Sequence, residues 1–121
     1  AAIDDDGECF VNGELKQKFH WDGCRVVLTT GGTGVGPRDV TPEAVREIGS
    51  KELPGFGEVM RLESRKLTPN AILTRSLAVV VDKALVICLP GKPQAAVECL
   101  GFVAGAIPHS LEVLGNAPTG C

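Results

Sequence analysis

The segment that most constrains the fold is a glycine-rich loop between a predicted strand and a predicted helix. Residues 29–44 read TTGGTGVGPRDVTPEA and follow the apolar run at 25–28. Continuous apolar and β-branched residues predict a buried strand over 25–30. Thr41, Pro42 and Glu43 predict a helix start, since threonine can cap it, proline suits its first turn and glutamate complements its dipole. This order is typical of an open α/β sheet, in which ligands bind at the carboxyl ends of the strands.

The glycines of this loop indicate that the backbone approaches a ligand closely. Glycine loses more conformational entropy on folding than other residues, and without a Cβ its backbone N–H groups can reach an anion at a helix start. A turn that merely reverses the chain is the alternative. Two generic motifs do not fit. Gly36 is followed by Pro37 and Arg38 rather than by the Lys-Ser/Thr pair of a P-loop, and the glycine spacing is one residue short of a dinucleotide fingerprint.

The rest of the chain alternates predicted helices and strands. Periodicity and breakers predict helices at 42–48, 56–65 and 70–73, strands at 77–81 and 84–89, and a long helix at 94–115. Asp82 and Lys83 form a hairpin-length connection between the two strands, and Pro108 is expected to kink or split the long helix. Residues 14–19 are expected to form a short helical turn.

Composition narrows the class of protein. We expect 121 residues to form one domain, residues 1–121, of an ordinary soluble, cytoplasmic protein. A net charge of −3 with one Trp and four Phe disfavours a nucleic-acid partner. The apolar run 77–89 is too short and too charged to span a membrane. Five cysteines without a C-x-x-C pair predict reduced core thiols, and His20 and His109 lack metal-ligand spacing.

Several motifs in order along the chain carry a family resemblance. After the loop and its PRDVTPEA continuation come Pro54-Gly55-Phe56-Gly57-Glu58, Leu73-Thr74-Arg75-Ser76, Leu89-Pro90-Gly91-Lys92-Pro93 and Ile107-Pro108-His109. Over roughly residues 25–115 the chain resembles the molybdopterin-binding domain family, which includes bacterial MogA and MoaB and the gephyrin G domain. Within this family, the chain resembles the MogA and gephyrin-G branch.

The resemblance implies a fold and an activity. The implied fold is an α/β domain of three layers, α/β/α, with a mostly parallel sheet, usually assembled as a homotrimer. The implied reaction joins molybdopterin and Mg-ATP to give adenylyl-molybdopterin and pyrophosphate, and the implied partner is a molybdenum-insertion (MoeA-like) protein or fused domain. A non-catalytic trimerising scaffold and a CinA-like nucleotide pyrophosphatase are the alternatives.

The resemblance also assigns roles to residues. Gly31, Gly32, Thr33 and Gly34 would cradle the substrate anion; Thr74, Arg75 and Ser76 would lie on the pterin side; Pro90, Gly91 and Lys92 would bind the nucleotide. Asp39 would be catalytic and hold Mg²⁺, because carboxylates suit hard cations, and Asp5 would be a second catalytic carboxylate. The alternatives are an accessory helix cap for Asp39, a solvated acidic turn for Asp5 and a surface lysine for Lys92.

One departure from the family is large. Family members usually begin with a strand ending in Ser-Asp, a substrate loop, a helix and a second strand. Here Ile3-Asp4-Asp5-Asp6 resembles the end of that second strand. We therefore expect the chain to lack roughly the first third of the family domain, namely its first strand, its first helix and its second strand.

Overall fold

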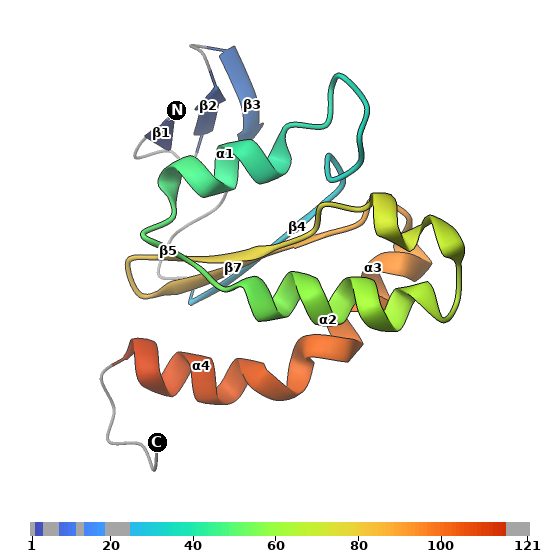
Figure 1. Ribbon diagram of the computed structural model, residues 1–121. Coiled ribbons are helices and arrows are strands. Elements are labelled where there is room, and N and C mark those ends of the chain that lie inside the picture. Colours follow the sequence, from blue (N-terminus) through green and yellow to red (C-terminus); the bar gives the residue numbers. More distant parts are fainter. Residues whose placement is uncertain (1, 4–7, 12–13, 19–24, 116–121) are drawn as a thin grey trace.

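The computed structural model describes residues 2–3, 8–11, 14–18 and 25–115. Its main sheet has four strands in the order β4-β7-β6-β5 (Figure 1). These are β4 (Val26–Thr30), β5 (Lys51–Glu52), β6 (Ala78–Val81) and β7 (Ala84–Leu89). The predicted strands at 25–30, 77–81 and 84–89 are confirmed, whereas the two-residue strand β5 was not predicted.

The α/β class is confirmed, but the sheet is mixed where a mostly parallel one was expected. β4 pairs with β7 in parallel, while β6 runs antiparallel to both β7 and β5. The reason is the connection between β6 and β7, because Asp82 and Lys83 are the only residues between them and two residues can join only antiparallel neighbours. Asp82 adopts a positive φ of 53° there, a conformation that aspartate tolerates in turns.

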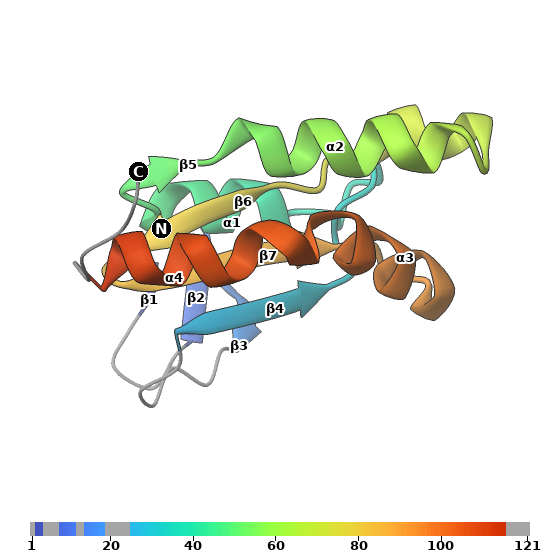
Figure 2. The ribbon, with the colours of Figure 1, turned by 90° about the horizontal axis from the view of Figure 1, so that it is seen from below.

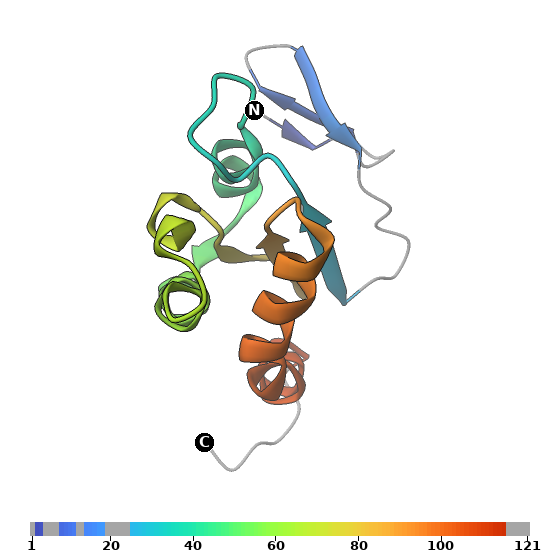
Figure 3. The ribbon, with the colours of Figure 1, turned by 90° about the vertical axis from the view of Figure 1, so that its right-hand side faces the viewer.

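Helices cover both faces of this sheet (Figures 2 and 3). Helix α1 (Thr41–Ile48) lies on one face; α2 (Pro54–Arg65), α3 (Pro93–Val103) and α4 (Ile107–Leu114) lie on the other. Side chains of the strands alternate between two cores. Val79, Val86 and Cys88 pack with Ala44 and Val45 of α1, and Ala78, Leu85, Ile87 and Leu89 pack with Met60, Ala96, Cys99 and Val103 of the other helices. The three-layer arrangement is therefore confirmed.

The C-terminal helical segment is split where Pro108 predicts it. A 3₁₀ turn, η2 (Ala104–Ala106), separates α3 from α4, and Pro108 lies in the first turn of α4. Leu100, Ile107, Leu111 and Leu114 pack against the core, whereas Val97 is 73% exposed. Among the described residues, Pro93–Leu114 is the one helical stretch long and apolar enough to cross a membrane by length and composition. A helix that packs on a sheet has the same composition.

The N-terminal strands form a second sheet. β1 (Ala2–Ile3), β2 (Glu8–Val11) and β3 (Glu14–Lys18) pair antiparallel in sequence order and lie beside α1 (Figure 3). The helical turn expected at 14–19 is therefore wrong. Glu14–Lys18 contains good helix formers, but pairing with β2 overrides that local preference.

Candidate functional site

Two loops meet at the carboxyl ends of the parallel strands. The register aligns Thr30 of β4 with Leu89 of β7, so the loops that follow these strands begin side by side. The Gly31 amide donates to the Leu89 carbonyl at 3.0 Å. A Cβ added to Gly91 would lie 3.2 Å from the Cα of Gly31. The glycine loop and the loop before α3 therefore touch through their backbones, at the edge where α/β sheets bind ligands.

The glycine loop presents a row of backbone donors. Gly31 and Gly32 have φ values of 90° and 70°, in the left-handed region that glycine adopts without strain. In the described part of the chain, the amides of Gly32, Thr33 and Gly34 donate to no protein group. Successive N–H groups with left-handed residues among them form an anion-binding concavity. The Gly31 amide is engaged by Leu89, so the available donors are those of residues 32–34.

Thr41, the first residue of α1, connects the glycine loop to this helix through hydrogen bonds. Its Oγ1 donates to the Gly31 carbonyl at 3.0 Å, and its amide donates to the Gly32 carbonyl at 3.1 Å. A Cβ on Gly32 would lie 2.2 Å from that hydroxyl oxygen. The predicted capping role of Thr41 is wrong, because Val40 is the N-cap and makes no side-chain capping bond. The hydroxyl is instead turned back onto the loop, where it explains the need for glycine at position 32.

Asp39 closes the far side of the same loop. Its Oδ2 accepts from the Gly36 amide at 2.9 Å, and its own amide donates to the Gly36 carbonyl at 3.1 Å. A Cβ on Gly34 would lie 2.8 Å from this carboxylate oxygen. The carboxylate thus lies against the row of donors, and the alternative of a helix cap at Pro42 is not what its contacts show. Among the described residues no three His, Cys, Asp or Glu side chains form a metal-binding group.

The segment 74–76 precedes β6 and contacts the glycine loop, although β7 lies between β6 and β4 in the sheet. A row of hydroxyls runs from Thr33 through Thr74 to Ser76, with oxygen separations of 3.5 and 3.1 Å. Between them the Arg75 amide donates to the Thr33 carbonyl at 2.7 Å. The Arg75 guanidinium also forms an ion pair with Glu43 of α1. Segment 74–76 therefore contacts both the loop and the helix that follows it.

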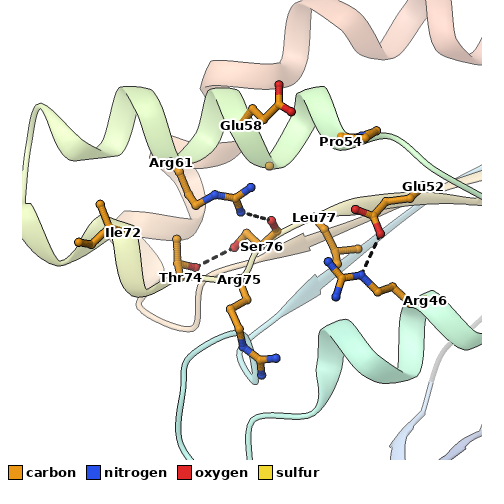
Figure 4. Close-up of a pocket in the computed structure, with 11 residues that line it drawn as sticks. Arg46, Glu52, Pro54, Glu58, Arg61, Ile72, Thr74, Arg75, Ser76 and Leu77 are labelled. Carbon is orange, nitrogen blue, oxygen red and sulfur yellow. Dashed lines mark hydrogen bonds and ion pairs between the residues drawn. The ribbon is translucent and has the colours of Figure 1, made fainter.

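A cavity of about 300 Å³ lies between this segment, α1 and α2. Its lining includes three arginines, Arg46, Arg61 and Arg75, beside Thr74 and Ser76 (Figure 4). Arg61 donates to the Ser76 carbonyl at 2.8 Å, and Arg46 pairs with Glu52 at 2.8 Å. The cavity therefore offers a polar wall on the side of the site away from α3.

Gly57 brings α2 close to this wall. A Cβ on Gly57 would lie 2.6 Å from the Ser76 carbonyl oxygen. Our sequence reasoning did not assign Gly57, Arg61, Arg46 or Glu43 to the site. The Gly-Phe-Gly-Glu motif was the one signal for Gly57, and no local pattern marks the other three.

The remaining predicted residues fall into two groups. Pro90, Gly91 and Lys92 lead into α3, with Lys92 exposed at its N-cap, so free backbone donors of that helix face the same edge. Asp5 lies outside the described residues. Below the site, burial raises the pKa of the Cys88 thiol to about 11.

Comparisons with known proteins give a consistent result. Residues 3–109 match the family model described as "Probable molybdopterin binding domain". The molybdopterin adenylyltransferase of Helicobacter pylori strain J99 is 52% identical over 94 residues, which cover 77% of this chain and 53% of that protein. Gephyrin of Dictyostelium discoideum is 43% identical over 94 residues, covering 78% of this chain and 13% of gephyrin.

Solved structures agree with the sequence matches. The crystal structure of the molybdopterin biosynthesis enzyme MoaB from Thermus thermophilus has a TM-score of 0.73 and 44% sequence identity, and covers 81% of this chain and 62% of that chain. The chain thus spans about half the length of the Helicobacter relative that it matches.

Proposed function

The chain belongs to the molybdopterin-binding domain family, and we propose that it acts in a molybdopterin adenylyltransferase, with residues 1–121 contributing one domain. The observation that carries the proposal is the row of free amides at Gly32, Thr33 and Gly34, with the Asp39 carboxylate against it. In the proposed reaction an oxygen of the molybdopterin phosphate attacks the α-phosphorus of ATP. The bond from that phosphorus to the β-phosphate oxygen breaks, and pyrophosphate leaves.

The glycine loop would hold the phosphate of molybdopterin. Three backbone donors in a loop of fixed shape match a phosphate's acceptors, and they need no reorganisation as the reaction proceeds. The Gly91–Lys92 segment and the first turn of α3 would hold phosphates of ATP, since helix N-termini favour anions. The backbone contact between Gly31 and Gly91 would then bring the two substrates together.

Asp39 is the described carboxylate best placed to hold Mg²⁺. One of its oxygens accepts from Gly36, which fixes the carboxylate beside the donors of the loop. Mg²⁺ is commonly bound through one or two carboxylates together with substrate phosphates and water, so a single aspartate fits its needs. When bound, the metal would neutralise charge that builds up on the phosphates. Asp5 would supply the second carboxylate.

The cavity beside segment 74–76 would receive the pterin end of the substrate. A pterin ring carries donors and acceptors around its edge, and Thr74, Ser76 and Arg61 provide polar groups at the cavity wall. The row of hydroxyls continues to Thr33 in the loop. A substrate bound in this way would extend from the phosphate loop to the cavity.

We propose a homotrimer for the assembly and the cytoplasm for its location. Exposed apolar residues on α2, η1 (Pro69–Leu73), α3 and the turn between α2 and η1 support an interface between copies. They include Leu62, Leu67, Ile72 and Val97. The product would pass to a molybdenum-insertion (MoeA-like) protein or domain.

The test is Asp39→Asn in the full-length protein. Asparagine keeps an oxygen that can accept from the Gly36 amide but removes the charge. We expect adenylyl transfer to fall by at least about 100-fold, the scale of losing one transition-state electrostatic group, with molybdopterin binding and melting temperature near wild type. Asp82→Asn is the matched control, because it removes the same charge from the hairpin turn. A near wild-type rate for Asp39→Asn would refute the catalytic role of Asp39. Binding of molybdopterin without turnover by the wild type would favour a non-catalytic scaffold.

A further inference from the structure

We propose that Arg75 is a positioning residue that fixes the glycine loop and Asp39, rather than a ligand of the substrate. The proposal rests on the proposed function, since it concerns the geometry of the same site. The family resemblance implies a place for Arg75 on the pterin side, so the structure gives this side chain a different task.

Every nitrogen of the guanidinium is engaged by the loop or by α1. Nε donates to the Gly34 carbonyl at 2.8 Å, and Nη2 donates to the Asp39 carbonyl at 2.6 Å. Nη1 forms the ion pair with Glu43. Together with the bond from the Arg75 amide to Thr33, these contacts hold both ends of the segment 33–39.

The direction of the side chain agrees with these contacts. Figure 4 shows Arg75 pointing away from Thr74 and Ser76, toward the glycine loop and α1. Arg75 therefore lines the cavity without presenting its guanidinium to it. Glu43 also compensates the positive charge, which leaves less of it for an anionic substrate.

The contacts depend on the shape of arginine as well as on its charge. Two of the three partners are neutral carbonyls, which a planar fork can reach together. Lysine places one compact charge on a flexible stem and cannot make this set. If Arg75 served only to attract a phosphate, the Arg75→Lys variant would retain part of the activity, because lysine keeps the positive charge.

Without these hydrogen bonds, the glycine loop would no longer be held in its conformation. The carbonyl of Gly34 and the carbonyl of Asp39 flank the stretch that carries the free amide of Gly34 and the Asp39 carboxylate. A displacement of about 1 Å in a reacting geometry can lower a rate by roughly 100-fold. Removing the Arg75 guanidinium should therefore lower the catalytic rate by displacing Asp39.

The experiment compares Arg75→Lys with Arg25→Lys in the full-length protein. Arg25 is the matched control, because its guanidinium also donates to a backbone carbonyl, that of Leu111, but it precedes β4, at the end of the strand away from the glycine loop. We expect Arg75→Lys to lower kcat by roughly 100-fold and Arg25→Lys to leave it within about threefold. In the Asp39→Asn background, Arg75→Lys should cost little further, because a residue that acts through another is non-additive with it. Additive losses, or a near wild-type kcat for Arg75→Lys, would overturn the proposal.

Amide hydrogen exchange gives a readout that does not need turnover. Without substrate, Arg75→Lys should speed exchange at Gly36 and Asp39, whose amides are hydrogen-bonded within the loop, and leave α3 unchanged. If the wild type transfers no adenylyl group while this exchange still increases, the proposed function fails and the role of Arg75 stands. Unchanged exchange at Gly36 and Asp39 overturns the role of Arg75.

Glu43→Gln covers the case in which Arg75→Lys does not fold. This change removes the countercharge and keeps an oxygen that can accept from Arg75. A substrate-binding Arg75, released from its countercharge, would lower the KM for molybdopterin, and that result would overturn the proposal. We expect a lower kcat and an unchanged or higher KM.

Discussion

Gly32→Ala tests whether the glycine loop is fixed by its contact with α1. The left-handed φ of 70° costs a residue with a Cβ about 1–2 kcal/mol. The new Cβ would lie 2.2 Å from Thr41 Oγ1, so the hydroxyl must rotate away and lose its bond to the Gly31 carbonyl. That hydrogen bond contributes about 1 kcal/mol. We expect the free energy of unfolding to fall by about 2–3 kcal/mol.

The assay is urea denaturation at equilibrium, with Gly101→Ala as the control. Gly101 lies inside α3, and a Cβ there would meet nothing within 4 Å. Alanine is the better helix former by about 1 kcal/mol, so this variant should be as stable as the wild type or more so. The two glycine substitutions therefore have opposite expected signs.

A double variant separates the two causes of the loss. Thr41→Ala alone removes the hydroxyl and its bond, and so should cost about 1 kcal/mol. Gly32→Ala with Thr41→Ala should then be less destabilised than the sum of the two single variants, because the same bond is lost in each. Stability of Gly32→Ala within about 0.5 kcal/mol of wild type would refute the reasoning, since neither the backbone conformation nor the contact would then matter.

Two further predictions concern the core and the assembly. The folded Cys88 thiol keeps its proton to about pH 11, whereas an unfolded one titrates near 9.0. The unfolded state therefore binds fewer protons, and the free energy of unfolding should fall as pH rises from about 9 to 11. Urea titrations at pH 8 and 10.5 measure this fall, and an equal fall in the Cys88→Ala variant would contradict the prediction. Light scattering at micromolar concentration should give the mass of a trimer, and a monomer mass would contradict the proposed assembly.

The strands and helices of the main sheet could be predicted from local patterns. β7 is buried along its whole length and reads as a continuous apolar run. Proline lies in the first turn of α1, α2 and α3, where its fixed φ favours a helix start. The elements that sequence reasoning missed or misassigned lack such signals: β5 has two exposed residues, and β3 owes its conformation to pairing with β2.

The contacts of the site were harder to predict than its residues. The glycines, Asp39, Thr74, Arg75 and Ser76 were named from motifs, and the structure brings them to one edge. The partners of Thr41 and Arg75 were not predicted, because a hydroxyl can cap a helix or bind a carbonyl ten residues away with the same local sequence. The hydrogen-bond partner of such a side chain depends on tertiary packing, which cannot be predicted from the spacing of residues in the sequence.

The antiparallel direction of β6 is what completes the site. Ligands are expected at the carboxyl ends of β4 and β7, where the two loops begin. In a mostly parallel sheet, the segment before β6 would lie at the opposite edge. Because β6 runs antiparallel to β7, Leu77 lies beside Cys88. The Cys88 amide donates to the Leu77 carbonyl at 2.8 Å. Ser76 and Arg75 consequently reach the edge that carries the glycine loop. The two-residue turn at Asp82 and Lys83, remote from the site, thus determines that Arg75 can hold Asp39.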